Sequence, residues 1–421
     1  MRENRVTRRK ALAIAGGAGA AGLAGCASGG RSGDSGQSDG SNSATLWAWN
    51  DPGLSPIREE QAKEFEKKHG LDGVNWQYYP FDNYLAKATS AIPAGNAPDS
   101  LALSVLWVPR FGDKGVAVNL EEHGFSPDDY VTAARNNSSY DGTLWSVPWY
   151  ADCRLLCINK QMFEQAGLEV PDPSHRPSWD EFANWVEELG KEHGTGYSMA
   201  AGEGLDAFVL SNGSGYLTED GSKAAINNAA AVEAAEFLQP MVVEDEHVLA
   251  RTSGTTHVED FLSGQAPMLY AGSWHYPRLR DSGIDWQYNP HPGGPRIEKS
   301  HTWSAGVYYS VPSRGGADQE IGRKWLEYID SMEVQKNVTR AMGGFPGRKD
   351  AYETDAFKQY LDDHPKLKVV AQEMENAVAF PSHPDVGKMW TAVHTQAEAI
   401  FQGTDPKSAL DKAAEEINGL L

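Results

Sequence analysis

The chain has 421 residues, of which 58 are Asp or Glu and 37 are Lys or Arg, so its formal charge is −21 at neutral pH. An acidic surface repels nucleic acid and anionic lipid, and this excludes binding to either by charge alone. The chain beyond position 43 is long enough for two or three domains, and it holds no second apolar span.

The segment 1–25 is typical of an export signal. A basic stretch ending in Arg8 and Arg9 precedes an uncharged apolar run over 11–23, which is too short to span a membrane. Residues 23–26 (LAGC) close the run and resemble a bacterial lipobox, which implies that Cys26 becomes the lipidated first residue of the mature protein. Ordinary cleavage beside an incidental cysteine is the alternative. We expect export, with lipid anchoring on the outer face of the cytoplasmic membrane.

Two other motifs lie in the same segment. Residues 7–9 resemble part of a twin-arginine signal, but the positions after them depart from that pattern, so export of a folded or an unfolded chain stays open. Gly17, Gly19 and Gly22 have the spacing of a dinucleotide-binding turn. That turn needs a strand before it and a helix after it, and here it lies in a segment to be removed, so we discard it.

Residues 26–43 are predicted to form a flexible tether. Ser and Gly occupy 11 of the 17 positions from 27 to 43, and no large apolar side chain is present. Such a segment cannot bury enough apolar surface to fold.

Strand and helix signals alternate along the body and predict a parallel-type sheet covered by helices. Gly70 is expected to end the first helix, which reaches His69. Strands are predicted over 74–79, 101–106, 154–159, 266–271 and 307–311. The expected helix caps are Ser55, Asp82, Ser178 with Glu181, and Asp405.

Cys153 and Cys157 are predicted to be free thiols. Four residues of strand separate them by roughly 13 Å, beyond the ~7 Å limit for a disulfide. No Cys or His partner lies at the spacing that zinc needs, so we expect no metal site and no cofactor.

Several short motifs resemble the family 1 extracellular solute-binding proteins, the sugar-capturing subunits of ABC importers. The central set comprises YDG at 140–142, VPWYAD at 147–152, INK at 158–160 and SWDEF at 178–182. Further matches follow in the family's order, with FLSG at 261–264, MLYAGSW at 268–274, GGFPGRK at 343–349 and ALD at 409–411. The resemblance covers nearly the whole mature chain.

This resemblance implies an α/β, two-lobed periplasmic-binding-protein-like (type II) fold with the ligand in a cleft between the lobes. Lobe 1 would comprise 44–152 and 305–344, and lobe 2 would comprise 153–304 and 345–421. The chain would cross between them near 151–155, 303–306 and 343–345. The family also implies binding without catalysis, a carbohydrate ligand, permease subunits as partners and a monomer.

The aromatic residues suit a carbohydrate, because sugars present apolar faces that stack on flat rings. Residues that close a strand or lie at a crossing are better placed than those on helices, since ligands of open α/β sheets lie beyond the strand ends. The predicted contacts are Trp49, Trp107, Trp149, Tyr150, Trp274 and Trp303. Trp179, Trp185 and Trp325 are expected in the core, Trp145 is expected to pack, and Trp390 fits either role.

Polar residues at the same places could bond sugar hydroxyls. Asn50 follows the first strand, and Asp82 could contact ligand, cap its helix, or do both. Asp152 and Arg154 flank the first crossing, where they could bond a sugar or pair with each other. Arg348 resembles the family's arginine after the third crossing, although Gly347 stands where alanine is usual.

Two alternatives stay open. A secreted carbohydrate-active enzyme would also place carboxylates in an aromatic cleft, but the chain has neither H-E-x-x-H nor G-x-S-x-G. The same fold could instead bind a peptide or a polyamine.

Overall fold

The computed structural model describes residues 42–51, 53–252 and 256–421. The predicted export signal, Cys26 and the tether up to residue 41 lie outside the described residues. Ser43 already belongs to a strand, and the side-chain amide of Asn42 donates to the carbonyl of Gly70 at 2.7 Å. In the described part of the chain, no helix is both long and apolar enough to cross a membrane.

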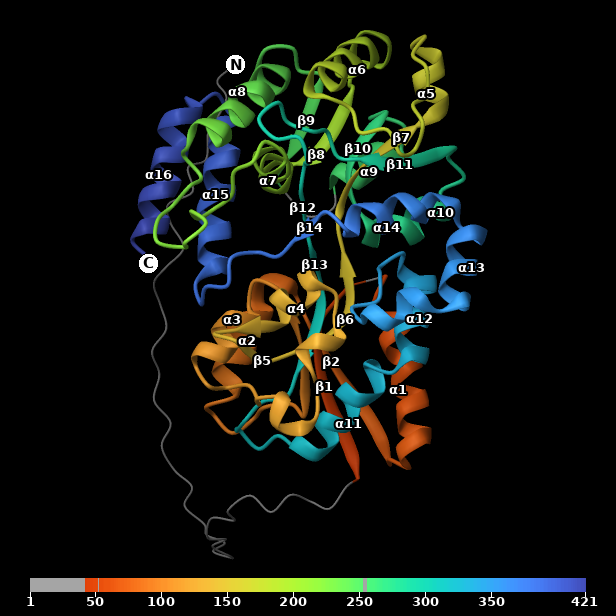
Figure 1. Ribbon diagram of the computed structural model, residues 1–421, viewed down its shortest axis with the longest axis vertical. Coiled ribbons are helices and arrows are strands. Elements are labelled where there is room, and N and C mark those ends of the chain that lie inside the picture. Colours follow the sequence, from red (N-terminus) through yellow and green to blue (C-terminus); the bar gives the residue numbers. More distant parts are fainter. Residues whose placement is uncertain (1–41, 52, 253–255) are drawn as a thin grey trace, which may run out of the picture. The chain divides into compact units, whose positions relative to one another are not determined.

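Two five-stranded sheets organise the fold (Figure 1). The first runs in the order β2 (Gly73–Tyr79), β1 (Ser43–Trp49), β3 (Ser100–Ser104), β13 (Ala305–Ser310) and β6 (Val147–Asp152). The second runs in the order β11 (Trp286–Pro290), β7 (Arg154–Asn159), β10 (Met268–Gly272), β8 (Tyr197–Ala200) and β9 (Val248–Arg251). Two short pairs join β12 (Thr302–Trp303) to β14 (Ala377–Val378) and β4 (Ser139–Tyr140) to β5 (Thr143–Leu144).

Both sheets are mixed, so the prediction of a parallel-type sheet was right for only part of each. β1 pairs in parallel with β2 and β3, whereas β13 is antiparallel to β3 and β6. In the second sheet, β7 is antiparallel to β10 and β11, and β8 is parallel to both of its neighbours. Local β-α-β succession reveals the parallel pairs, but it carries no signal for strands such as β6 and β13, which pair although they lie far apart in the sequence.

Each sheet has its own covering helices (Figure 1). With the first sheet lie α1 (Ser55–His69), α2 (Phe81–Ala91), α3 (Val108–Asp113), α4 (Thr132–Ser138), α11 (Gln319–Ile329) and α12 (Met332–Met342). With the second lie α5 (Lys160–Gln165), α6 (Trp179–His193), α7 (Ala201–Ser211), α8 (Ala229–Val243), α9 (Thr256–Leu262), α10 (Tyr276–Arg280), α13 (Asp355–Asp363), α14 (Lys368–Met374), α15 (Val386–Ile400) and α16 (Pro406–Asn418). The last two pack on α7 and α8 rather than on strands.

Most of the predicted helix ends are confirmed. Ser178 and Glu181 form the capping box of α6, Asp405 caps α16, and Gly70 ends α1 in the left-handed conformation at φ 62°. Two caps were wrong. Leu54 precedes α1, which makes Ser55 its first residue, and Pro80 precedes α2, so Asp82 is the second residue of its helix. Proline fixes its own φ, and the extended backbone at Pro80 starts the helix two residues earlier than a cap at Asp82 would.

The chain leaves the first sheet at the end of β6 and enters the second at the start of β7, with only Cys153 between them. At this point Ala151 pairs with Gly306 on one side and exchanges two backbone hydrogen bonds of 2.8 Å with Phe345 on the other. Gly306 has φ 131°, and a Cβ there would lie 2.1 Å from the carbonyl oxygen of Tyr150. Three connecting segments therefore lie side by side, and glycine permits their close approach. The lobe boundaries stay a prediction.

The predicted free thiols are confirmed, since Cys153 and Cys157 are both buried and unpaired. The core assignment of three tryptophans is also confirmed. Trp179, Trp185 and Trp325 are all buried.

Candidate functional site

An aromatic wall forms where three parallel strands of the first sheet end. Trp49 closes β1, Phe81 follows β2, and Trp107 follows β3. The ring of Trp49 meets those of Phe81 and Trp107 edge to face, with centroids 5.5 and 5.7 Å apart, and Phe81 and Trp107 are 5.0 Å apart. Trp49 and Trp107 are buried, but Phe81 keeps 42% of its surface exposed. An exposed phenylalanine on two buried indoles gives this wall an apolar face that is open to a ligand.

Helix α15, from the group that packs with the second sheet, provides the opposite wall. Trp390, Thr391 and Thr395 line it. The centroid of the His394 imidazole lies 3.7 Å from that of the Trp390 ring, and the imidazole hydrogen-bonds the carboxylate of Asp206 at 2.9 Å. Trp390 therefore lines the cavity wall, one of the two roles that the sequence left open.

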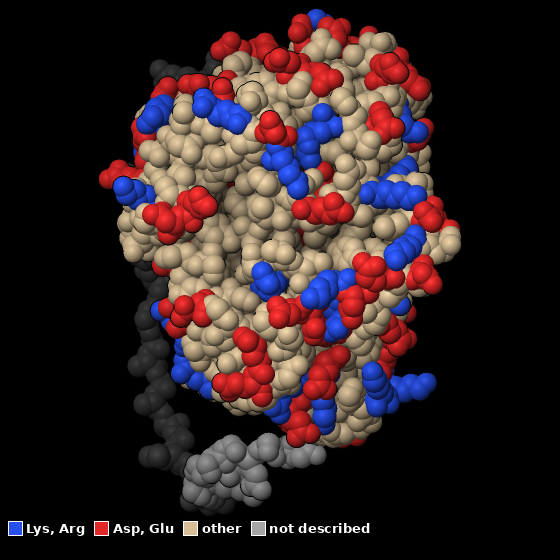
Figure 2. Space-filling model, in the orientation of Figure 1, with Lys and Arg blue, Asp and Glu red and all other residues tan. Residues whose placement is uncertain are grey.

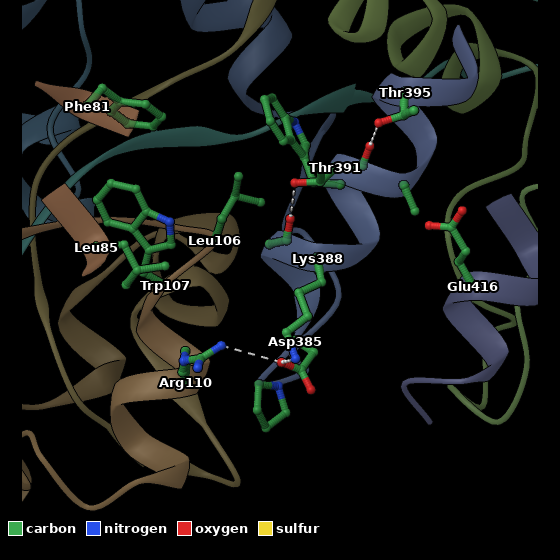
Figure 3. A pocket seen from close by; sticks show the side chains of 14 residues that line it. Phe81, Leu85, Leu106, Trp107, Arg110, Asp385, Lys388, Thr391, Thr395 and Glu416 are labelled. Atoms are coloured by element: carbon green, nitrogen blue, oxygen red, sulfur yellow. Dashed lines mark hydrogen bonds and ion pairs between the residues drawn. The ribbon is translucent and has the colours of Figure 1, made fainter. Parts of the chain in front are cut away.

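The two walls enclose a cavity of about 470 Å³ (Figure 3). Its volume lies within the range of small-molecule sites in proteins. Arg110 of α3 reaches across it, with Nη1 3.5 Å from Oδ1 of Asp385 at the start of α15. Lys388 bonds the same oxygen at 2.8 Å, and this bond is the main reason that the pKa of Asp385 lies below its ordinary value. Two cations and two carboxylates, Asp385 and Glu416, leave the lining close to neutral.

A second groove is larger, at about 1160 Å³. It is lined by α4, the turn at 140–142 and the segment 378–382. No tryptophan lines it, and it lies away from the carboxyl ends of β1, β2 and β3. Those ends are where open α/β sheets bind ligands, so we take the aromatic cavity as the site.

The charged residues beside the first crossing form a separate cluster. Arg154 donates from Nη1 to Asp152 at 2.8 Å and from Nε to the hydroxyl of Tyr270 at 3.0 Å. Its guanidinium carbon lies 4.6 Å from the Trp274 ring centroid, and Nη2 is 4.0 Å from the carboxylate of Glu203. Asp152 and Arg154 are buried, whereas Glu203 and Trp274 are partly exposed. Asp152 and Arg154 therefore pair with each other, which is one of the two roles predicted for them.

Burial sets the titration of this cluster. Loss of hydration raises the pKa of Asp152 to about 6, and the positive charge of Arg154 opposes that rise. Burial also lowers the pKa of His275, which precedes α10 and packs beside Trp274. His275 is therefore neutral at physiological pH.

Three predicted aromatic contacts are packed inside the protein. Trp149 is fully buried and donates from its indole nitrogen to Gln61 at 3.0 Å. Tyr150 is buried at the crossing, where a Cβ on Gly344 would come within 2.6 Å of its ring. Trp303 is stacked on Phe380, with centroids 4.4 Å apart. None of these three predicted contacts lines the aromatic cavity.

Arg348 and Asn50 also lie outside the cavity lining. Arg348 pairs with Asp330 at 3.0 Å and with Asp350 at 2.9 Å. Asn50 is exposed just beyond β1, and Asp82 lies in the first turn of α2. Of the predicted set, the structure joins Trp49 to Trp107 and Asp152 to Arg154 and Trp274, and as ligand contacts all eleven residues stay predictions.

Several lining residues were missed from the sequence. Phe81 lies at a strand end, as Trp49 does. The rule that ligands of open α/β sheets lie beyond the strand ends, called the strand-end rule below, could therefore have found it. Arg110 lies one helical turn beyond Trp107, on the same face. No local signal marks Asp385, Lys388 or Glu416, because α15 and α16 reach the cavity only through tertiary packing.

Charge is distributed without a dominant patch on the face shown in Figure 2. Acidic and basic side chains are interspersed, and they surround a hollowed central area of mostly uncharged residues. Within the described residues, no group of three or more His, Cys, Asp or Glu side chains is arranged to hold a metal ion.

Comparison with known proteins agrees with this architecture. The family model for bacterial extracellular solute-binding proteins matches residues 60–367. A maltotriose-binding protein of Pyrococcus abyssi is 22% identical over 90% of this chain and 82% of its own length. A diacetylchitobiose-binding protein of Streptomyces coelicolor is 23% identical over 91% of each chain.

A solved structure shares the fold over most of the chain. It is an ABC transporter solute-binding protein from Thermotoga lettingae bound with α-D-tagatose, with a TM-score of 0.79 and 26% identity. The match covers 90% of this chain and all of that one. The two-lobed α/β fold is therefore confirmed. Because the family model covers most of the chain, this protein belongs to the bacterial extracellular solute-binding proteins.

Proposed function

We propose that the protein captures an oligosaccharide between its lobes and delivers it to the permease of an ABC importer. The observation that carries this proposal is the cavity in which Phe81 and Trp107 face Trp390 across about 470 Å³. The family is one of non-catalytic solute-binding proteins, so the enzyme alternative is not supported.

The chemistry of the lining suits a neutral sugar. Flat aromatic side chains on both walls can stack on the C–H faces of successive rings. The hydroxyls of Thr391 and Thr395 and the charged groups of Arg110 and Asp385 can bond sugar hydroxyls at the edges. A lining that is close to neutral offers no net charge attraction to a polyamine.

Relatives support the same class of ligand. The two curated relatives are named for maltotriose and diacetylchitobiose, and the Thermotoga protein was solved with a monosaccharide. At identities of 22–26%, these names support carbohydrate as a class and leave the individual sugar to experiment.

Movement of the lobes about the paired crossings would enclose the ligand. Three adjacent segments at Ala151, Gly306 and Phe345 form a narrow connection between the sheets, and hinge closure is a general route to ligand capture. The difference in free energy between open and closed forms then depends on the ligand.

The cellular setting is part of the same proposal. Export would leave the mature chain held by a lipid on Cys26, with the residues between Cys26 and Asn42 as the tether and the body facing outward as a monomer. These elements rest on the sequence, and only the extracytoplasmic setting is shared by the family.

Thermal unfolding of residues 42–421 tests the ligand class. The panel holds maltotriose, N,N′-diacetylchitobiose, D-tagatose, a tripeptide and spermidine. A bound sugar at 100 times its Kd adds about 2.7 kcal/mol and raises the midpoint. Trp107→Ala should reduce the shift by about half or more at the same sugar concentration, and Trp145→Ala, outside the cavity, should retain it. A shift with the tripeptide or spermidine alone would keep the fold and overturn the sugar.

A further inference from the structure

Arg58 is a fully buried arginine beneath the aromatic wall. It lies in the first turn of α1 and has no accessible surface. Its Nε donates to the hydroxyl of Tyr309 at 2.9 Å, and its Nη1 donates to the backbone carbonyl of Trp49 at 3.0 Å. Nη2 is buried and has no hydrogen-bond partner among the described residues. Both protein bonds of this cation therefore go to neutral oxygens.

The guanidinium also lies over two indole rings. Its central carbon is 5.4 Å from the ring centroid of Trp49 and 5.3 Å from that of Trp149. Attraction between a cation and an aromatic face is stronger when both are removed from water. Arg58 thus holds Trp49 twice, by its carbonyl and by its ring.

Burial of the Arg58 charge is energetically unfavourable. A buried charge without a carboxylate loses its hydration, and apolar residues of similar volume often replace buried charges without loss of stability. Arg58 also bonds Trp49, the last residue of β1, where the first sheet meets the cavity. An effect on the position of Trp49 accounts for both the charge and its location.

We propose that Arg58 is a positioning residue that fixes Trp49 and, through it, the aromatic wall of the cavity. Trp49 meets Phe81 and Trp107 edge to face, so its orientation sets where those two rings lie. Arg58 acts on ligand affinity through Trp49 and does not touch the ligand. This inference rests on the proposed function for its effect on affinity, but the positioning itself needs no ligand.

Fluorine NMR of protein labelled with 5-fluorotryptophan tests the positioning without ligand. Trp49 is assigned by loss of its signal in Trp49→Phe, and Trp107 by the same substitution at its own position. In Arg58→Gln, the Trp49 and Trp107 signals should shift and broaden, and Arg58→Lys, which keeps the charge, should restore part of the change. Trp286 in the second sheet is the internal control. Unchanged Trp49 and Trp107 signals in Arg58→Gln would overturn the proposal.

A double-mutant cycle tests the effect on affinity, with maltotriose, N,N′-diacetylchitobiose and D-tagatose as probes. Arg58→Gln should weaken binding at least tenfold in the wild-type background and have little further effect in Trp49→Phe, because both act through one ring. Independent, additive losses would contradict a route through Trp49. If none of the three sugars binds the wild type, the proposed function loses its support, and the fluorine spectra still decide whether Arg58 positions the wall.

Discussion

Arg110 and Asp385 form an ion pair between the two walls of the cavity, with 3.5 Å between Nη1 and Oδ1. Arg110 belongs to α3, which lies with the first sheet, and Asp385 directly precedes α15, which packs on α7 and α8. Their pairing therefore links α3 to the start of α15. The side chains are 36% and 27% exposed, so solvent screens the attraction and its contribution is modest.

Asp385→Asn should shift the lobes toward an open form in the absence of ligand. An exposed pair contributes about 0.2–1 kcal/mol, which corresponds to at most roughly a fivefold change in the ratio of closed to open molecules. Energy transfer between dyes on Ser90→Cys and Ser408→Cys in residues 42–421 measures this ratio, since both positions are exposed and Cys153 and Cys157 are buried. Lys388→Gln is the control, because it removes a bond to Asp385 within one helix. Equal effects of the two variants would show that the pair does not favour closure.

Gly306→Ala should destabilise the crossing by about 1–3 kcal/mol. A Cβ at this position would lie 2.1 Å from the carbonyl oxygen of Tyr150, and the φ of 131° is unfavourable for alanine. Urea unfolding measures the loss. Gly95→Ala is a matched control, because Gly95 also has a positive φ but a Cβ added there would have no atom within 4 Å. A loss no greater than that of the control would mean that the three segments do not need this close approach.

Asp152 should make stability fall as pH rises from about 4 to 6. Its folded pKa of about 6 lies above the unfolded value near 3.9, so the folded state binds more protons in this window and loses stability as they leave. In Asp152→Asn that contribution is absent, and the amide oxygen can still accept from Arg154. The difference in unfolding free energy, wild type minus variant, should therefore decrease across the window by about 2–3 kcal/mol. A difference independent of pH would contradict the raised pKa.

Phe81→Ala and Trp107→Ala should each weaken sugar binding roughly tenfold to a hundredfold, since each removes a stacking surface on the order of 1–3 kcal/mol. Trp149→Phe should change affinity little and mainly reduce stability, because its indole nitrogen is buried on Gln61. Titration calorimetry and thermal unfolding on the same samples separate the two effects. The reverse pattern would place the site at the first crossing.

The helix ends and the strand ends were predictable because their signals are local. The capping box of Ser178 and Glu181 and the left-handed Gly70 depend on side chains within one turn. The strand-end rule located Trp107 at the cavity for the same reason. Trp149 could not be separated from Trp107 in this way. Every residue of β6 is buried, so alternation along that strand gives no sign of which side chains face a ligand.

The other half of the cavity depends on packing between distant segments. Trp390 and Asp385 meet Trp107 and Arg110 from the far end of the chain, and no periodic pattern in α15 reports that contact. The antiparallel pairing of β6 with β13 is non-local in the same way. The sequence therefore predicted Trp107 at the strand ends, left the role of Trp390 open, and did not mark the charged residues of the opposite wall.

A crystal structure of residues 42–421 with the sugar that raises the unfolding midpoint would test the central claim most directly. The sugar should lie between α3 and α15, with a ring against Phe81 or Trp107 and Trp390 on the opposite side. A sugar bound in the groove beside Tyr140 and Phe380, or on the outside of either lobe, would contradict the assignment of the site.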